Sequence, residues 1–396
     1  MKKSMTLFMI LGPLAGIVML SVLTPTDTAE AIPAFARKYS MSCTTCHAPV
    51  PRLKEYGDEF AGNGFVLKDQ EAPRYFIKTG DDNLDLIRDL PLAARIDGFI
   101  QHQTVSDRDV DLSLPFNLKL LSGGSLTKDI AYYFYFYISE RGEVVGIEDA
   151  YIMFNNVFNS ELDIYLGQFQ VSDPLFKREL RLTYEDYQIY KFSPGNSRIN
   201  MAYDRGIMMT YGFETGTDLI FEIINGNGIG VADEEFKVYD DDKYKCAVGR
   251  LSQNINDNLR LGVIGYYGKE GNQIVNEVTI GGIDASLALG AAELNLQFLE
   301  RKDTDPFMEE GGPANAKVLS RGGLAELIIM PHGDRSKLYG VASYNVIDYD
   351  HDAPGYHSIT GHLGHVIRTN IRGFVENTYM IEDEENRFVL GIMVGF

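Results

Sequence analysis

The sequence predicts an all-β fold: a transmembrane β-barrel of about 16 antiparallel strands after a short helical or irregular N-terminal segment. Three observations predict this fold. Apolar and polar residues alternate with a period of two from Leu92 onward, the candidate strands are even in number, and long connections alternate with tight ones. After residue 31 no apolar run is long enough for a membrane helix, so a spanning structure has to be a barrel.

The first predicted element is a cleavable signal peptide at residues 1–31. The chain begins MKK, continues as an apolar stretch from Met5 to Leu23, and reaches A-E-A at residues 29–31. This order of basic start, apolar core and small residues is typical of an export signal. The alternative interpretation is an uncleaved N-terminal anchor.

The next element carries the pattern CxxCH, in SCTTCH at residues 42–47. In this pattern Cys43 and Cys46 form thioether links to haem vinyl groups, and His47 becomes the proximal ligand of the haem iron. The alternatives are a thioredoxin-like CxxC, which no βαβ pattern supports, and a zinc site, which lacks a second Cys or His cluster at metal-site spacing. The sequence therefore predicts one covalently bound haem c.

A short helix is expected after the motif, from about Pro51 to Phe60, closed by Gly62 and Gly64. The predicted haem-binding segment, residues 32–90, is too small to bury a haem in a core of its own. We therefore expect it to lie in or against the mouth of a wide barrel, as a plug whose pocket the barrel completes.

The barrel is predicted over residues 91–396. Leu162, Ile164 and Leu166, for example, alternate with more polar neighbours, as in a strand with one apolar face. The sixteen candidate strands are residues 92–104, 115–125, 130–139, 147–155, 161–170, 204–213, 217–226, 243–252, 258–268, 274–287, 291–302, 317–329, 336–348, 357–367, 370–382 and 386–396.

The connections have the asymmetry of bacterial outer-membrane barrels, which have short periplasmic turns and long extracellular loops. The longer connections are residues 105–114, 171–203, 227–242, 303–316 and 349–356, and the tighter ones include residues 215–217, 254–258 and 368–370.

A soluble β-sandwich is the alternative fold. The export signal weighs against it, as do 23 Tyr and 22 Phe, enough to build aromatic girdles although Trp is absent. The last strand has one face formed by Phe388, Leu390, Ile392, Val394 and Phe396 and ends the chain on an aromatic residue, which resembles the C-terminal insertion signal of outer-membrane barrels.

Charged residues are expected on the inward faces of the strands. Arg95 and Asp97 alternate with Ile96, and Arg372 and Glu376 also lie opposite apolar neighbours, so an open, water-filled lumen is required.

The longest connection, residues 171–203, is expected either to fold into the pore as a constriction or to form a solvated surface loop with ion pairs. Its charged residues include Lys177, Arg178, Arg181, Glu185 and Asp186.

The distal ligand of the haem iron is less determined. His362 is the leading candidate, because it faces the lumen if Ile359, Leu363 and His365 face outward. The alternative is that His362 is only a polar residue of the lumen and binds no iron. Met41 lies too close to the first cysteine to reach the opposite haem face. His102 is expected to be a girdle residue, and His332, His351 and His357 are expected in turns or loops. Met201 or Met208 is an alternative distal ligand, and a further alternative is an iron without a distal ligand from the protein.

The amino-acid composition limits the kinds of binding partner. A net charge of −20 without clusters of Lys and Arg argues against nucleic acid as a partner. The same charge is compatible with cation attraction or with solubility alone. The third cysteine, Cys246, lies in an apolar alternating run, where an unpaired thiol is most often a small buried hydrophobe.

The chain resembles the fused monohaem cytochrome–porins of the outer membrane, whose best-known members oxidise ferrous iron. The matching residues are Ala31, Pro33, Phe35, Ala36, Arg37, Cys43, Cys46, His47 and Pro51. Iron-oxidising members commonly have Gln where this chain has Lys38, and LKEYGDEFAGNGF looks more like relatives of unassigned role. This departure puts the electron donor in doubt.

The resemblance implies electron transfer across the bacterial outer membrane through one haem c, with outer-membrane lipid and a periplasmic electron-carrier cytochrome as partners, and ferrous iron as a candidate donor. Carboxylates suit ferrous iron, and the acidic loop residues are 233–235, 240–242, Glu309 with Glu310, and Asp350 with Asp352. The alternative for the acidic loops is that they only keep the outer surface hydrated. The alternative functions are a diffusion porin with a structural or redox-gated haem plug, and outward electron transfer to an extracellular acceptor.

Overall fold

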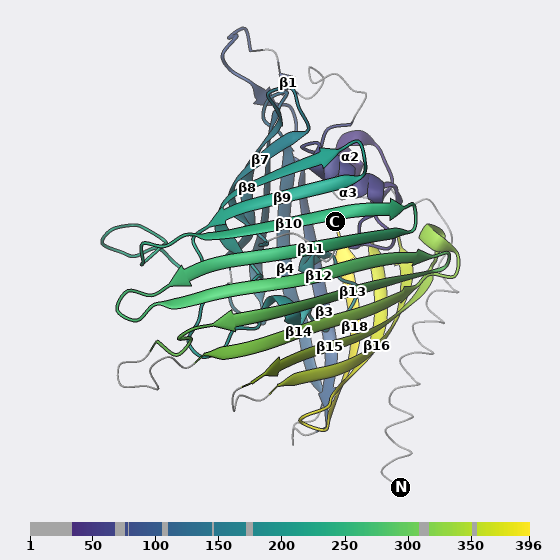
Figure 1. The fold of residues 1–396 in the computed structure, drawn as a ribbon. Helices are drawn as coiled ribbons and strands as arrows, with labels where there is room; N and C mark the ends of the chain where they lie inside the picture. The colour runs from purple at the N-terminus through teal and green to yellow at the C-terminus, as the bar shows by residue number, and fades with distance from the viewer. Residues whose placement is uncertain are drawn as a thin grey trace.

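A closed barrel of sixteen strands, β3 to β18, forms most of the molecule in the computed structural model (Figure 1). The structure describes residues 34–67, 76–77, 79–104, 110–144, 146–171, 177–308, 317–350 and 355–396. Each strand pairs antiparallel with the next along the chain, and β18 pairs with β3 to close the ring. The predicted fold class is confirmed. The predicted signal peptide, residues 1–31, lies outside the described residues.

The strands lie close to their predicted positions. Their bounds are β3 Leu92–Gln103, β4 Asp111–Ser125, β5 Ile130–Glu140, β6 Gly146–Val157, β7 Leu162–Phe169, β8 Asp204–Phe213, β9 Thr217–Ile224, β10 Cys246–Asn256, β11 Leu259–Glu270, β12 Asn276–Leu289, β13 Ala292–Asp303, β14 Val318–Ile329, β15 Leu338–Tyr349, β16 Tyr356–Arg368, β17 Ile371–Met380 and β18 Glu385–Gly395. A separate two-stranded sheet pairs β1 Phe76–Ile77 with β2 Leu86–Ile87.

The predicted start of β4 at residue 115 is wrong by four residues. A proline normally marks a strand boundary, because it cannot donate to the ladder. Here the register shifts between Asp97 and Phe99 of β3, opposite Pro115, and this irregularity lets β4 continue through the proline.

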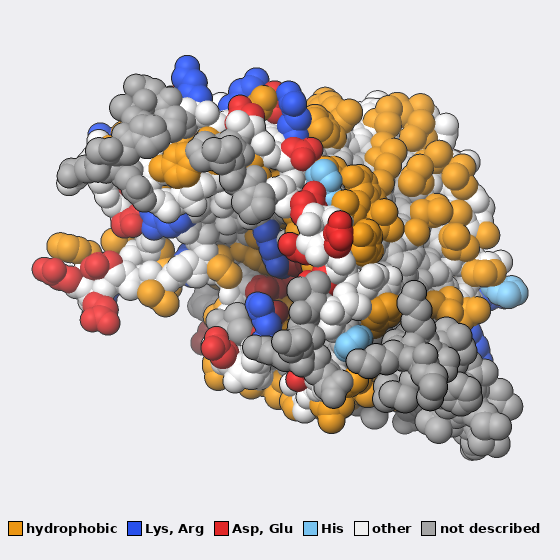
Figure 2. All heavy atoms as spheres, turned by 90° about the horizontal axis from the view of Figure 1, so that it is seen from below, with side chains coloured by type: hydrophobic (Ala, Val, Ile, Leu, Met, Phe, Trp, Pro, Cys, Tyr) orange, Lys and Arg blue, Asp and Glu red, His pale blue; other side chains and the backbone are white. Residues whose placement is uncertain are grey.

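The two faces of the wall differ as the alternation predicted. On β16, Ile359 and Leu363 are 53% and 42% exposed, whereas Thr360 and His362 are buried. Hydrophobic side chains gather over the right half of the face seen in Figure 2. In the described part of the chain, helices are all too short or too polar to cross a membrane.

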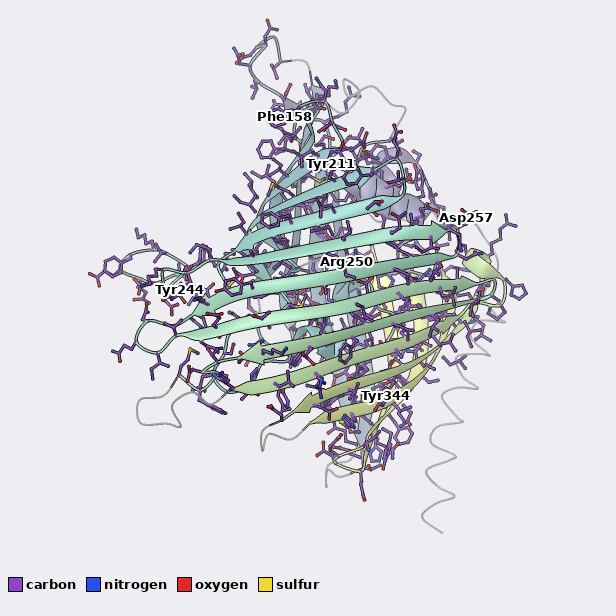
Figure 3. All side chains as sticks on the ribbon, viewed as in Figure 1. Phe158, Tyr211, Tyr244, Arg250, Asp257 and Tyr344 are labelled. Atoms are coloured by element: carbon purple, nitrogen blue, oxygen red, sulfur yellow. The ribbon has the colours of Figure 1, made fainter. Side chains whose placement is uncertain are left out.

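The barrel has two unlike ends. The turns that follow β4, β6, β8, β10, β12, β14 and β16 lie at one end, here called the short-turn end, and the connection between β9 and β10 lies at the other, the long-loop end. In Figure 3, Asp257 marks the short-turn end and Tyr244 the long-loop end.

The long connection between β7 and β8 folds into the barrel. Its described residues 177–203, here called the inner loop, include two short 3-10 helices, η3 Arg178–Leu180 and η4 Gln188–Tyr190. Ile189 and Tyr190 are fully buried and pack with wall residues in the main core cluster. The expectation that this connection folds into the pore is confirmed for residues 177–203, and the expectation of a solvated surface loop is wrong for them.

The N-terminal described residues 34–67, here called the CxxCH segment, contain α2 Ala34–Tyr39, η1 Cys43–Thr45 and α3 Glu55–Gly62. The predicted helix from Pro51 to Phe60 starts too early. The chain first makes a turn in which Ala48 N donates to Arg52 O at 3.0 Å and Lys54 N donates to Cys46 O at 2.8 Å.

Candidate functional site

The CxxCH motif forms a single tight turn. The Ser42 hydroxyl accepts from Thr44 N at 3.3 Å at the start of η1, and His47 N donates to Cys43 O at 2.9 Å. Cys43 begins this turn and Cys46 is its C-cap, and both are free thiols. Burial raises the pKa of both thiols above their ordinary value, so both stay protonated at neutral pH.

The His47 imidazole is held through one nitrogen. Its Nδ1 lies 2.9 Å from Pro51 O and 3.3 Å from Arg52 O. Carbonyl oxygens only accept, so Nδ1 carries the proton and Nε2 is the basic nitrogen. Burial lowers the pKa of His47, which favours the neutral imidazole that metal ligation requires.

This set of donors fits a c-type haem. Two thiols one turn apart suit the vinyl groups, and a neutral imidazole oriented by backbone carbonyls suits an axial position on the iron. Cys43, Cys46 and His47 are the residues that would hold it. The covalent haem itself stays a prediction.

Aromatic side chains form a small core beside the motif. The rings of Phe35 and Phe65 stack with centroids 5.0 Å apart, and Phe60 packs edge-on against Phe35 at 5.2 Å. Phe65 also stacks on Tyr133 of β5 at 5.5 Å. The segment thus has an apolar centre that continues onto the barrel wall.

Polar contacts attach the CxxCH segment to several sides of the short-turn end, where Figure 1 shows α2 and α3. They are the ion pair of Arg52 with Glu293, the ion pair of Lys54 with Asp334 at 3.3 Å, the bond from Asn155 Nδ2 to Gly62 O at 2.6 Å and the bond from Ser125 Oγ to Gly64 O at 3.4 Å. Because these partners come from β4, β6, β13 and the turn before β15, the segment spans the mouth of the barrel.

Two glycines permit this packing, and sequence reasoning missed the role of the first. A Cβ atom on Gly57 would lie 2.5 Å from Cys46 O, so the close approach of α3 to the motif requires glycine. Gly64 has φ +67°, and a Cβ atom there would lie 2.8 Å from the Ala131 side chain. The only sequence signal for Gly57 is a glycine inside a predicted helix.

The CxxCH segment does not fill the mouth. A cavity of about 1280 Å³ lies between α3, the inner loop, the wall from β9 to β14 and the turn before β15. Its lining includes Tyr56 of α3, Lys177 of the inner loop and Arg260 of β11. An open space therefore remains beside the segment.

His362 faces the lumen, as predicted. Its Nδ1 lies 2.9 Å from Glu376 Oε2, and its ring stacks on Phe374 and Tyr339 with centroids 4.7 and 5.6 Å apart. Among the described residues, His362 neither contacts the CxxCH motif nor lines the cavity beside it. The structure thus places the two predicted iron ligands in separate surroundings, and ligation by His362 stays a prediction.

The other candidate residues are distributed over the barrel. His102 stacks on Phe388 near a strand end, His332 lies in the turn before β15, His357 pairs with Asp348 and Glu382, and Met201, Met208 and Cys246 are buried in the main core cluster. His351 lies outside the described residues. The interpretation of Cys246 as a small buried hydrophobe is confirmed.

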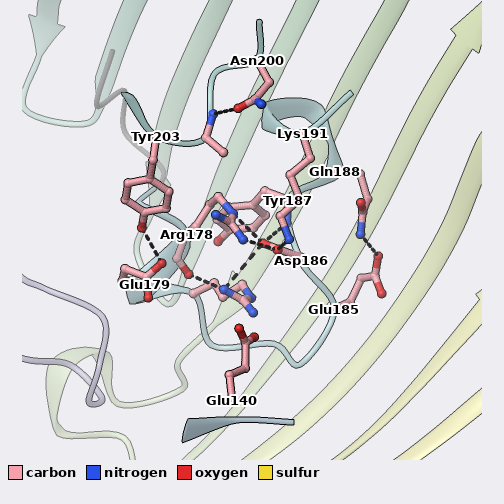
Figure 4. Close-up of polar contacts among 12 residues, drawn as sticks. Glu140, Arg178, Glu179, Glu185, Asp186, Tyr187, Gln188, Lys191, Asn200 and Tyr203 are labelled. Carbon is pink, nitrogen blue, oxygen red and sulfur yellow. Dashed lines mark hydrogen bonds and ion pairs between the residues drawn. The ribbon is translucent and has the colours of Figure 1, made fainter. Parts of the chain in front are cut away.

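Charged residues of the inner loop form a compact network (Figure 4). Asp186 accepts from Arg178 at 2.7 Å and also pairs with Arg181 and Lys191. The wall holds the loop through Glu376, which accepts from the backbone nitrogens of residues 184 and 185 at 2.7 and 2.8 Å. The predicted ion pairs are therefore present, but inside the lumen.

The acidic residues 240–242 lie at the long-loop end, and their carboxylates come within 4.8 Å of one another. Asp240 pairs with Lys245, and Asp241 pairs with Arg198 at 2.6 Å. Two of the three carboxylates are therefore already neutralised by protein cations. Glu309, Glu310 and Asp352, which were also expected to gather cations, lie outside the described residues.

Comparison with solved structures identifies the fold. The anion-selective porin from Comamonas acidovorans is 13% identical with a TM-score of 0.56, and the match covers 78% of this chain and 99% of that one. A refined porin structure is 11% identical with a TM-score of 0.55, covering 78% and 100%. The channel DcaP of Acinetobacter baumannii is 12% identical with a TM-score of 0.52, covering 78% and 97%.

No protein-family model matches the sequence, and no curated protein matches it as a relative. The structural likeness covers most of this chain, at identities that carry the fold alone. The chain therefore has the architecture of a sixteen-strand porin barrel, with the CxxCH segment across one mouth and the inner loop within its lumen.

Proposed function

We propose that this protein transfers electrons at the bacterial outer membrane through one haem c bound by Cys43, Cys46 and His47. The observation that carries the proposal is the geometry of the motif: two free thiols on one turn, and an imidazole whose Nδ1 is tied to Pro51 O. The haem would supply one-electron redox chemistry when bound. Cys43 and Cys46 would attach the haem, His47 would supply a nitrogen ligand to the iron, and the partly buried surroundings of the motif would influence the potential.

The membrane location is supported by the apolar exterior of the wall, exemplified by Ile359 and Leu363. In barrels of this type the short turns face the periplasm. The CxxCH segment then faces the periplasm, where c-type haem is attached and where an electron-carrier cytochrome can approach.

Ferrous iron is the proposed extracellular donor, attracted by the net charge of −20 of the chain. Electron flow in the outward direction, to an extracellular acceptor, uses the same residues. The potential of the haem decides the direction, because electrons move toward the higher potential.

The test is an anaerobic optical spectrum of the purified oxidised protein as ferrous iron is added at controlled pH. We expect the Soret and α bands to shift to the reduced form within seconds. Reduction by dithionite but not by iron would reject iron as the donor and retain the haem. A spectrum without haem bands, from protein expressed with haem-attachment machinery, would reject the electron-transfer proposal.

A second function, solute diffusion, is supported by two observations. The cavity of about 1280 Å³ beside the CxxCH segment leaves part of the mouth unfilled, and the fold is that of porins. Conductance in a planar bilayer separates the two functions. Large, stable channels in the haem-loaded protein would favour a diffusion porin, whereas poor conductance together with rapid haem reduction would favour an electron conduit.

A further inference from the structure

A second lumen cavity, of about 360 Å³, lies between the inner loop and strands β3 to β6, β17 and β18. It has the size of a small-molecule site. Its lining contains more Lys and Arg than Asp and Glu side chains. Eight cations against six carboxylates make this cavity electropositive within a chain of net charge −20.

Arg372 is the least compensated of these cations. It is only 4% exposed, and its Nη1 donates to Leu182 O at 2.9 Å and to the Tyr339 hydroxyl. No described carboxylate pairs with it, and its Nε has no hydrogen-bond partner among the described residues. A buried charge without a counterion costs free energy, so a bound anion would stabilise this guanidinium.

Two further guanidinium groups line the same cavity and also have a buried Nε without a partner in the described chain: Arg181 of the inner loop and Arg387 of β18. Arg181 lies 3.6 Å from Asp186, which already accepts from Arg178 and pairs with Lys191. One carboxylate thus serves three cations, and positive charge remains uncompensated on the inner-loop side.

The acidic residues of the lining are largely neutralised. Asp97 pairs with Arg95 at 2.8 Å, Glu140 with Arg141 at 3.7 Å, Glu179 with Lys119 at 3.8 Å, Glu185 with Arg387, and Asp186 with Arg178 at 2.7 Å. Glu376, on the wall beside Arg372, is also occupied, by His362 and two inner-loop nitrogens. Repulsion of a bound anion is therefore reduced.

We propose that this cavity is a binding site for a small oxyanion, such as phosphate, sulfate or a carboxylate, held by Arg181, Arg372 and Arg387. Guanidinium groups suit this role because their planar N–H donors match two oxygens of one anion. The three residues come from the inner loop, β17 and β18, so the site exists only when the inner loop is seated in the barrel. The proposal is independent of haem binding.

The test is isothermal titration of the full-length, detergent-solubilised protein with inorganic phosphate at low ionic strength. We expect saturable binding of one phosphate per chain. Arg181→Gln and Arg387→Gln should each weaken the affinity about tenfold, the effect of losing one charge-assisted contact. The matched control is Arg198→Gln, which removes the same charge from an inner-loop residue that pairs with Asp241 and does not line the cavity.

Arg372→Gln serves as a second variant, after its gel migration and far-ultraviolet circular dichroism show an intact barrel. It should lower the phosphate affinity at least as much as Arg181→Gln does. Absence of saturable heat in the unmodified protein would overturn the proposal. Equal weakening by Arg198→Gln would also overturn it, because it would indicate diffuse attraction by net charge.

Discussion

The CxxCH segment and the inner loop both lie against or inside the barrel without joining its sheet, yet they are held differently. The inner loop is fixed by buried polar groups of the wall. Arg301 of β13, which is fully buried, donates to the carbonyls of Phe192 and Ile199, and Glu376 accepts from two loop nitrogens. The inner loop therefore completes the interior of the barrel.

The CxxCH segment has its own aromatic centre and meets the wall mostly at the rim. Its ion pair of Arg52 with Glu293 is about one-fifth exposed on each side, and Asp334, the partner of Lys54, is 55% exposed. Water screens such contacts and weakens them. The difference indicates that the inner loop contributes to the stability of the barrel, whereas the CxxCH segment is a docked unit that contains the predicted haem motif.

The largest expected effect concerns that chemistry. The double variant Cys43→Ser with Cys46→Ser should lose all covalent haem, because serine forms no thioether, and should keep the barrel fold. Cys246→Ser is the matched control and should retain haem. Pyridine haemochrome spectra and gel migration with and without heating measure the two properties. Loss of the barrel in the double variant would contradict the description of the CxxCH segment as a docked unit.

The next prediction compares one residue that holds the inner loop with one that holds the CxxCH segment. Arg301→Met should lower the free energy of unfolding by about 3–5 kcal/mol, because the buried Asp303 carboxylate loses its ion-pair partner and two loop carbonyls lose the Arg301 donor. Arg52→Gln should lower it by about 1 kcal/mol or less. Urea unfolding in lipid vesicles measures both. Similar values for the two variants would remove the proposed distinction.

A smaller effect is expected for Glu376→Gln. Glutamine keeps one carbonyl oxygen for the backbone nitrogens of residues 184 and 185 but loses the charge, so the loss should be about 1–3 kcal/mol. Limited proteolysis should then cut the inner loop faster than in the parent protein. Unchanged proteolysis would show that other contacts suffice to seat the loop.

The smallest effect is expected at the rim. Asn155→Ala removes the hydrogen bond to Gly62 O and should weaken docking of the CxxCH segment by about 0.5–1.5 kcal/mol. Protease cleavage within residues 34–67 should accelerate while the free energy of barrel unfolding stays constant. A parallel fall in barrel stability would show that the segment supports the wall.

Much of the wall was predictable, because a strand with one apolar face carries a local signal of period two. Residues 204–213 were placed without error as β8, and His362 faces the lumen as its apolar neighbours predicted. The start of β4 was wrong because the register shift opposite Pro115 depends on the partner strand, which local sequence does not specify. The CxxCH pattern could also be recognised in the sequence, since its two thiols and its imidazole lie within five consecutive residues of the chain.

The contacts that hold the CxxCH segment against the barrel could not be predicted from local sequence. Asn155 is 93 residues from Gly62, and Glu293 is 241 residues from Arg52, so no local pattern connects them. Gly57 is required by its contact with Cys46 O, which appears only when α3 folds back on the motif.

By itself the sequence determined the barrel, its strand positions, its inward charges and the candidate haem motif, because periodicity and motif spacing are local properties. The sequence also predicted that the CxxCH segment lies in or against a barrel mouth. Only the tertiary structure decided that the inner loop enters the lumen, that the occupied mouth is the one with the short turns, and that a cavity remains beside the segment. The same is true of the convergence of Arg181, Arg372 and Arg387 on one cavity. These features depend on contacts between residues distant in sequence, and such contacts exist only after the barrel has closed.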